Sequence, residues 1–170
     1  MLTKNIKFTN FRENTNSSNK TKLAKILKNK NLVIEIPLLK SLSKDYQLSY
    51  SKKLVSSLKK FKKINLIGMG GSILGTQAIY DFLKDKIKKK INFFDNLQSK
   101  EFNTNKEKNI NIIVSKSGNT LETITNHNLI SLKEKKNKNL FITESKDSFL
   151  TQLANKLKAE IIEHKNFIGG

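Results

Sequence analysis

Hydrophobic and polar residues follow a regular rhythm from about Lys63 to the end of the chain. Short runs rich in isoleucine, leucine and phenylalanine are typical of β-strands, and most are followed by stretches whose apolar residues recur at helical spacing. The predicted strands are Ile64–Ile67, Ile91–Asp95, Ile110–Val114, Asn139–Thr143 and Glu160–Glu163. Because strands alternate with helices, the pattern predicts an α/β fold, a three-layer sandwich in which helices cover both faces of a five-stranded parallel sheet.

Four stretches carry apolar residues at helical spacing and are predicted as helices. The first lies within residues 49–62 and places on one face Leu54, Val55, Leu58 and Phe61. The second follows the first strand, and the residues expected to be buried are Leu74, Ala78, Ile79, Phe82 and Leu83. The last two follow the third and fourth strands, with apolar positions at Leu121, Ile124, Leu129 and Leu132, and at Phe149, Leu150, Leu153, Ala154 and Leu157.

The first 48 residues show a weaker pattern. Residues 1–20 are polar, rich in asparagine and without periodicity, which predicts a loosely ordered arm. Lys22–Asn29 predicts a short helix, and Leu32–Ile36 predicts a strand that ends at Pro37. The sequence thus divides into an N-terminal arm with a short helix, residues 1–48, and one domain, residues 49–170.

Two loops rich in glycine or hydroxyl groups follow the first and third predicted strands, Gly68–Ser72 and Ser115–Thr120. Right-handed crossover connections favour the flavodoxin-like strand order 2-1-3-4-5, in which these two strands are neighbours and the chain changes direction between them. Ligands of such sheets bind in the crevice at this switch point, beyond the carboxyl ends of the strands. Topology and loop chemistry therefore predict the same place as the binding site.

The second loop opens a predicted helix and combines hydroxyls with an ammonium group and a glycine. These side chains belong to Ser115, Lys116, Ser117, Gly118, Thr120 and Thr123. A helix N-terminus carries unpaired N–H groups and a partial positive charge, so the loop suits an anion such as phosphate. The same hydroxyls also suit simple helix capping, and the residues alone leave both interpretations open.

Three familiar motifs fail when they are tested against residues 68–76. The dinucleotide-binding fingerprint requires glycine where Ile73 stands, and a P-loop requires lysine where Gly75 stands. A nucleophile elbow requires glycine in place of Leu74. Each departure removes a residue on which the mechanism of that motif depends.

Composition narrows the possible functions. The formal net charge of +19 suggests a nucleic-acid partner, but Arg12 is the only arginine, and arginine is the residue that reads bases and phosphates by bidentate contacts. We therefore interpret the lysines as a solvated surface and expect no nucleic-acid partner. No apolar run approaches the roughly 20 residues of a membrane span, so no membrane association is expected. The absence of cysteine excludes disulfides and thiolate chemistry, and it fits a cytoplasmic protein.

Taken together, the segments Gly68–Gly75 and Ser115–Thr123 resemble the sugar isomerase (SIS) domain, and more closely the N-terminal part of the glucose-6-phosphate isomerase family. Met69 replaces the family's isoleucine and Ser117 its threonine, and both changes keep the needed size or hydroxyl. The resemblance covers residues 49–170 and implies aldose–ketose isomerisation of glucose 6-phosphate and fructose 6-phosphate without a cofactor. The alternative is a stand-alone SIS module that binds a phosphosugar without catalysis.

The resemblance also implies which residues contact the substrate. The phosphate would be held by Ser72, Ser115, Lys116, Ser117 and Thr120, with backbone support from Gly71, Gly118 and Asn119. Lys116 can equally point to solvent. Glu122 matches an acidic residue of the family, although a carboxylate near a helix N-terminus is also explained electrostatically. His127 and His164 fall in no matching motif and are interpreted as structural or surface residues.

The end of the chain resembles a further family segment, Val-Gly-Gly-Arg-Phe-Ser, just before its arginine. The matching residues are 166–170. In the family the groups that transfer the proton come later, in a second SIS domain and the C-terminal region, so we expect this chain to be an N-terminal half that is inactive alone. The complete enzyme is expected to be a homodimer.

Overall fold

The computed structural model describes residues 21–22, 24–25, 28, 36–97, 109–133 and 137–169. They belong to two compact units, Met1–Ser43 and Lys44–Gly170. In the first unit residues 21–22, 24–25 and 28 are helical, and Pro37–Leu42 forms a 3-10 helix, η1. The predicted arm, residues 1–20, lies outside the described residues, as do residues 32–35 of the predicted strand that ends at Pro37.

The second unit is built on a five-stranded parallel sheet with the order β2-β1-β3-β4-β5. The strands are β1 (Lys63–Ile67), β2 (Lys90–Phe94), β3 (Asn109–Val114), β4 (Lys138–Thr143) and β5 (Glu160–Glu163). Both the strands and their order confirm the sequence prediction. The neighbouring positions of β1 and β3 bring the loops that follow them to one edge of the sheet.

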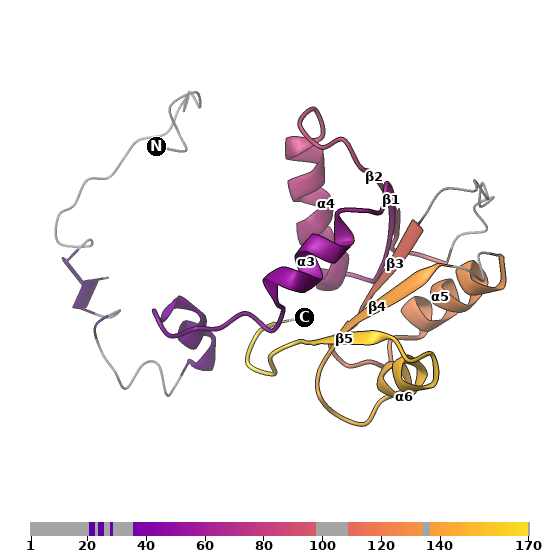
Figure 1. Ribbon diagram of the computed structural model, residues 1–170. Coiled ribbons are helices and arrows are strands. Elements are labelled where there is room, and N and C mark those ends of the chain that lie inside the picture. The colour runs from indigo at the N-terminus through magenta and orange to yellow at the C-terminus, as the bar shows by residue number, and fades with distance from the viewer. Residues whose placement is uncertain are drawn as a thin grey trace. The chain divides into compact units, whose positions relative to one another are not determined.

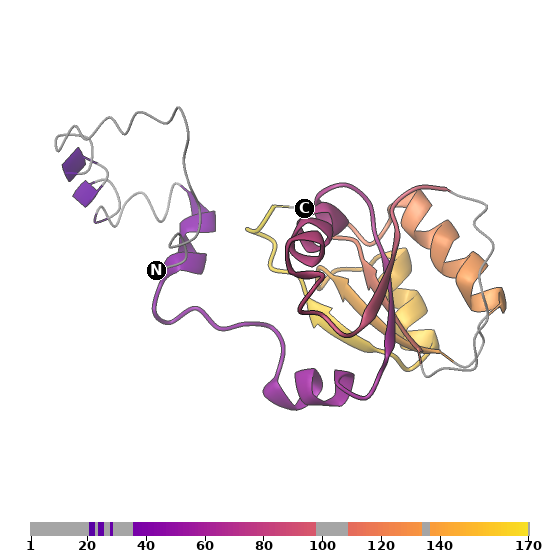
Figure 2. The ribbon, with the colours of Figure 1, turned by 90° about the horizontal axis from the view of Figure 1, so that it is seen from above.

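Helices cover both faces of the sheet (Figures 1 and 2). They are α3 (Lys52–Leu58), α4 (Gly71–Leu83), α5 (Leu121–Lys133) and α6 (Phe149–Lys156). One buried cluster joins α5 and α6 to the sheet through Ile113, Ile130, Phe141, Leu150 and others. A second joins α3 to the opposite face through Leu54, Phe61, Ile110 and Leu140. The three-layer sandwich is therefore confirmed.

Helix α3 is shorter than the predicted stretch 49–62 because side chains define both of its ends. At its start the hydroxyl of Ser51 accepts a hydrogen bond from the backbone N–H of Leu54 at 3.1 Å. After its end the ammonium of Lys89 donates to the carbonyls of Lys59, at 2.7 Å, and Phe61. A cation at a helix C-terminus satisfies unpaired carbonyls and complements the helix dipole, so Lys89 fixes α3 to the loop before β2.

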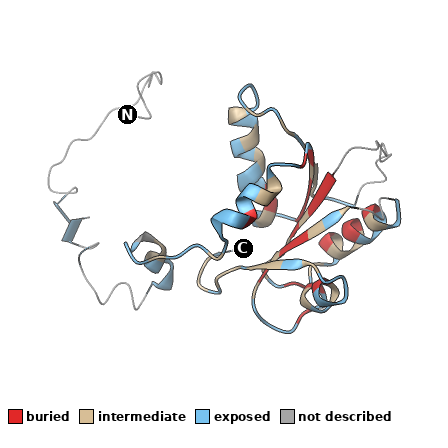
Figure 3. Cartoon of the chain, in the orientation of Figure 1, coloured by how far each residue is buried: buried red, intermediate tan, exposed pale blue. Residues whose placement is uncertain are grey.

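The prediction for the buried face of α4 is wrong. Of the predicted core positions, Leu74, Ile79 and Phe82 have 58%, 62% and 82% of their surface exposed. Much of α4 is accordingly coloured as exposed in Figure 3. Instead Ile73 is buried, and the ring of Tyr80, two helical turns further along, packs with its centroid 5.5 Å from that of Phe93. The helix carries apolar residues on two faces, and periodicity alone does not tell which of them meets the sheet.

Helix α5 buries three polar side chains beside one apolar side chain. Its buried residues are Thr123, Asn126, His127 and Ile130. Leu121 and Leu132, two of the apolar positions that predicted the helix, are exposed. The apolar period was sufficient to predict the helix, but of the predicted positions Ile124 packs against the core cluster while Leu121 and Leu132 face solvent.

Candidate functional site

The loops after β1 and β3 lie side by side at the carboxyl edge of the sheet, as the strand order requires. Gly68 ends β1 so close to the next strand that a Cβ at this position would lie 3.1 Å from the carbonyl oxygen of Val114. Its backbone N–H donates to the carbonyl of Phe94 at 3.2 Å. Glycine at this position therefore allows the carboxyl ends of β1, β2 and β3 to lie close together.

Three hydroxyls gather in the loop between β3 and α5. Ser115 Oγ lies 2.8 Å from Thr120 Oγ1, and Ser117 Oγ lies 3.5 Å from both. Ser115 is buried, Thr120 is half-buried and Ser117 is exposed, so the cluster extends from the sheet edge to solvent. The structure thus brings the three hydroxyls together, and their role in holding a phosphate stays a prediction.

Backbone N–H groups of the same loop orient two of these hydroxyls. Gly118 N–H donates to Ser115 Oγ and Asn119 N–H donates to Ser117 Oγ, both at 3.2 Å. Because each oxygen accepts a backbone hydrogen bond, its own proton is directed away from the loop backbone. Ser115 and Thr120 share one hydrogen bond at 2.8 Å, so one of their two protons stays within the pair. The other proton and that of Ser117 can be donated to an acceptor outside the loop.

The loop is also fixed to the start of α6. Asn119 Oδ1 accepts from the N–H of Phe149 at 2.9 Å, and the N–H of Leu150 donates to the carbonyl of Gly118 at 3.0 Å. Gly118 has φ +70° and lies against Ser148, which caps α6. Ser148 was not expected at this site from the sequence, although serine before a predicted helix is a typical cap.

The ammonium of Lys116 is not directed toward the hydroxyls. It donates to the backbone carbonyl of Ile168 at 2.6 Å and lies 3.8 Å from the carboxylate of Glu144. That carboxylate pairs more closely with Lys146, at 2.7 Å, and this hydrogen bond lowers the pKa of Glu144, with a smaller contribution from the charge of Lys116. Neither Ile168 nor Glu144 was expected at the site from the sequence.

The loop after β1 contributes the N-terminus of α4. Gly70, at φ +56°, precedes the helix and offers no side-chain cap to its first N–H groups. Gly71 is exposed and Ser72 is half-buried in the first turn. The N–H groups of Ser72 and Ile73 donate to the carbonyls of Met69, at 3.2 Å, and Gly70, at 3.1 Å. The loop after β1 therefore adds the hydroxyl of Ser72 and the positive end of the α4 dipole.

The acidic and imidazole candidates lie in different surroundings. Glu122 is half-buried in the first turn of α5, directly after the loop of residues 115–120, called the hydroxyl loop below. His127 is buried further along α5, and His164 is half-buried after β5, where its Nδ1 lies 3.1 Å from the carbonyl of Lys165. Of the three, Glu122 alone follows the hydroxyl loop directly in the chain.

The clustered hydroxyls of the loop after β3, beside the loop that carries Ser72, suit a tetrahedral oxyanion with several oxygens to accept hydrogen bonds. In the described ranges no group of three or more His, Cys, Asp or Glu side chains is placed to hold a metal ion. Among the helices that the structure describes, none has the length and apolar character needed to cross a lipid bilayer.

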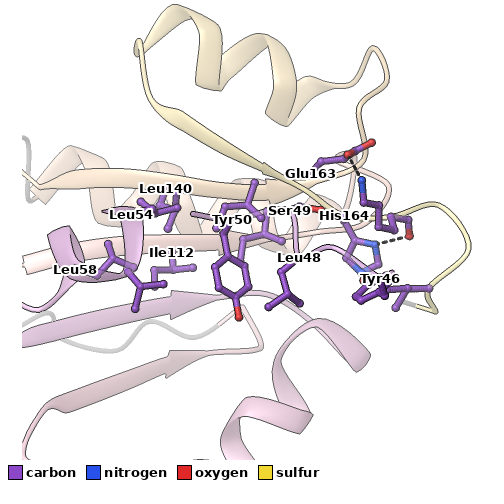
Figure 4. A pocket seen from close by; sticks show the side chains of 15 residues that line it. Tyr46, Leu48, Ser49, Tyr50, Leu54, Leu58, Ile112, Leu140, Glu163 and His164 are labelled. Atoms are coloured by element: carbon purple, nitrogen blue, oxygen red, sulfur yellow. Dashed lines mark hydrogen bonds and ion pairs between the residues drawn. The ribbon is translucent and has the colours of Figure 1, made fainter. Parts of the chain in front are cut away.

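A hollow lies on the α3 face of the sheet (Figure 4). It encloses about 390 Å³, and its walls are mostly apolar, with Leu54, Leu58, Ile112 and Leu140 among them. Tyr46, His164 and Ile168 line it as well. The segment after β5 therefore closes part of this hollow while its backbone contacts Lys116.

Comparison with known proteins gives a consistent result. The family model described as phosphoglucose isomerase matches residues 13–167. Glucose-6-phosphate isomerase from Borreliella burgdorferi is 39% identical over 112 residues, which is 56% of this chain and 21% of that enzyme. The enzyme of the same name from Methanocaldococcus jannaschii is 41% identical over 97 residues, or 51% of this chain and 24% of the relative. The chain thus spans about a fifth to a quarter of the length of these relatives.

Among solved structures, a hypothetical protein from Thermus thermophilus shares the fold. It superposes with a TM-score of 0.63 over 90% of this chain and 39% of its own, at 18% sequence identity. At this identity the likeness supports the architecture of the domain and nothing further.

Proposed function

The chain belongs to the phosphoglucose isomerase family, and from that membership we propose that it supplies the phosphate-binding half of an enzyme that interconverts glucose 6-phosphate and fructose 6-phosphate. The observation that carries this proposal is the hydroxyl cluster of Ser115, Ser117 and Thr120 at the carboxyl end of β3. It lies at the switch point of the sheet, where α/β folds bind their ligands.

In the proposed site a phosphate lies between the loops after β1 and β3. The groups assigned to it are the hydroxyls of Ser72, Ser115, Ser117 and Thr120 and the backbone of Gly71, Gly118 and Asn119. Lys116, which the sequence resemblance also assigned to the phosphate, donates to the carbonyl of Ile168 instead. Hydrogen bonds from donors to a charged acceptor are stronger than those between neutral groups. The N-termini of α4 and α5 add partial positive charge from two directions.

Isomerisation moves a proton between two neighbouring carbons of the sugar through an enediolate. In this proposal the phosphate anchor orients the sugar, while a general base and a cation for the developing charge come from the part of the isomerase fold that the match does not cover. We assign Glu122 a supporting role near the phosphate loop, because it follows that loop within one helical turn. The complete enzyme is proposed to be a cytoplasmic homodimer.

Titration of the purified chain with fructose 6-phosphate tests the binding half of the proposal. Removing one hydroxyl donor to a charged group costs about 1.5–3 kcal/mol. Ser72→Ala and Thr120→Val are each expected to weaken binding roughly tenfold to a hundredfold. Ser57→Ala is the matched control, because its hydroxyl donates to the Leu54 carbonyl within α3, away from the site. Equal affinity of all three variants would mean that the hydroxyls serve only as caps.

A second candidate is a phosphosugar-binding module without catalysis. It is favoured because the chain matches only about a fifth of the length of its relatives. A coupled dehydrogenase assay on the purified chain distinguishes catalysis from binding. We expect weak binding and no measurable turnover, because acid–base catalysis contributes about 10²–10⁴-fold and none of the groups assigned here performs it. Turnover that Ser115→Ala abolishes would contradict this, and Glu122 would be the first residue to test as the base.

A further inference from the structure

The backbone of Lys116 is fixed between two strands. Its carbonyl accepts from the N–H of Glu144 at 3.2 Å, and Thr143 Oγ1 lies 3.5 Å from the same oxygen. The preceding residue, Ser115, donates its N–H to the carbonyl of Ile142 at 3.1 Å. The side chain of Lys116 therefore starts from a defined point at the carboxyl ends of β3 and β4.

The ammonium of Lys116 is already engaged. It is 2.6 Å from the carbonyl oxygen of Ile168, and Glu144 lies beside it at 3.8 Å. A hydrogen bond from an ammonium to a carbonyl is of the charge-assisted class, and the adjacent carboxylate balances the charge. The contact joins residues that are 52 positions apart in the chain.

The segment that Lys116 contacts is a turn after β5, residues 165–169. Ile168 N–H donates to the carbonyl of Lys165 at 3.0 Å, and the ring of Phe167 lies edge-on to Tyr46 at 6.5 Å. The backbone bond from His164 N–H to the Thr143 carbonyl, at 2.8 Å, fixes the start of this segment to β4. Beyond that bond, the ammonium of Lys116 ties the turn to the loop that carries the hydroxyls.

From this geometry we propose that Lys116 is a positioning residue: its ammonium holds the turn 165–169 against the hydroxyl loop and is not a ligand of the phosphate. This deepens the proposed function and rests on it, because the position of the turn matters to a phosphosugar only if the loop binds one. The phosphate is then held by hydroxyls and backbone groups alone, and Lys116 remains on Ile168 when the anion binds. The turn becomes a fixed wall beside the site.

Amide hydrogen exchange on the purified chain tests this assignment. In Lys116→Met the amides of residues 166–169 are expected to exchange at least tenfold faster, while those of β3 keep their protection. Lys116→Arg retains a cation and is expected to stay within threefold of the unchanged chain. Lys146→Met is the matched control, because it removes the other lysine beside Glu144 and leaves the contact with Ile168 in place. If Lys116→Met loses protection throughout β3, Lys116→Gln takes its place in the comparison.

Titration with inorganic phosphate, followed by amide NMR shifts, supplies the second readout. A positioning role predicts that Lys116→Met changes the phosphate affinity less than threefold. A tenfold loss of affinity, or unchanged exchange of residues 166–169, would overturn the proposal. If phosphate binds nowhere near the loop in the unchanged chain, the proposed function fails, and the exchange comparison alone decides whether Lys116 holds the turn.

Discussion

Gly118 determines the shape of the hydroxyl loop at the level of a single residue. At φ +70° an L-side chain is strained, and a Cβ would lie 2.6 Å from the Cβ of Ser148 and closer still to its Oγ. A left-handed conformation costs about 1–2 kcal/mol, and forced overpacking typically adds 1–3 kcal/mol. Gly118→Ala should therefore lower the free energy of unfolding by about 2–4 kcal/mol, as measured by urea denaturation.

The matched control for Gly118 is another glycine of the same domain. Gly75 lies inside α4, and nothing lies within 4 Å of a Cβ placed there. Alanine stabilises a helix interior relative to glycine, so Gly75→Ala should raise the free energy of unfolding by about 0.5–1 kcal/mol. A Gly118→Ala variant that is as stable as the unchanged chain would show that the loop tolerates a side chain at this position.

His127 makes stability depend on pH in a defined direction. It is buried in α5, with Nε2 at 3.1 Å from Ser131 Oγ and its ring 5.7 Å from Phe141. Burial lowers the pKa of His127 from the ordinary value of 6.5, although the amides of Asn139 and Asn128 partly oppose this. The folded chain therefore binds this proton more weakly than the unfolded chain does. The contribution of neutral His127 to stability is complete above pH 6.5. It is lost as the pH falls from 6.5 toward the lower pKa that His127 has in the folded chain.

Urea denaturation at several pH values between about 5.5 and 7.5 measures this effect. The unchanged chain should lose stability as the pH falls, and His127→Asn should lose much less over the same interval. The comparison uses the slope against pH, so a constant loss of stability in the variant does not affect it. Identical slopes would mean that His127 does not titrate between the folded and unfolded states.

At the scale of elements, the sequence was sufficient to predict all five strands and the four helices of the domain, because each has a local apolar period. The contacts of those elements were harder to predict. Leu74 and Phe82 were expected in the core and are exposed. Their helix has two apolar faces, and the apolar period is the same whichever face packs on the sheet. The contacts of α5 were also not predicted, because its buried face includes the polar residues Asn126 and His127.

The sheet contains a ladder of asparagines that the sequence did not reveal. Asn92 donates to Asn65, Asn65 to Asn111 and Asn111 to Asn139, with Nδ2 to Oδ1 distances of 2.9, 2.9 and 3.0 Å. The four residues are paired in register across β2, β1, β3 and β4. Each occupies an isolated polar position in its own strand, so the ladder exists only through the strand register, which is not a local property.

Breaking this ladder in the middle should be costly. Asn65 and Asn111 are buried, and a buried amide without a partner costs about 1–3 kcal/mol. Asn111→Val is expected to lower the free energy of unfolding by roughly 2–3 kcal/mol, whereas Asn92→Val on the edge strand should cost about 1 kcal/mol. Replacing all four asparagines by valine should recover much of the loss, because no amide of the ladder is then left without its ladder partner. Asn137, which also donates to Asn111 Oδ1 at 3.3 Å, is only half-buried and keeps access to water. A quadruple variant as unstable as the sum of its single changes would contradict this account.

At the scale of the whole molecule, the candidate site divides into a part that the sequence predicted and a part that it did not. The hydroxyl loop and the glycine loop were found because each is a short local motif and the topology places both at one switch point. The contacts of Lys116 with Ile168 and of Gly118 with Ser148 join distant segments. Nothing in either local stretch indicates such a pairing, so only the folded domain reveals it.

The exposed face of α4 gives the domain a surface that should associate in solution. Leu74, Ile79 and Phe82 expose most of their side chains on this one helix. Contiguous apolar surface favours association, while the net charge of +19 opposes it by repulsion between copies. Salt screens the charge and not the apolar contact, so association should increase between about 20 mM and 300 mM salt.

Sedimentation velocity at the two salt concentrations measures this association. Phe82→Ser removes the largest exposed side chain of the face without changing the net charge, so the variant should remain more monomeric at high salt. Leu132→Ser is the matched control, because it removes an exposed leucine from α5, on the opposite face of the sheet. If both variants associate as strongly as the unchanged chain, the α4 face is not the contact surface. If Leu132→Ser alone becomes monomeric, the contact lies on the α5 side.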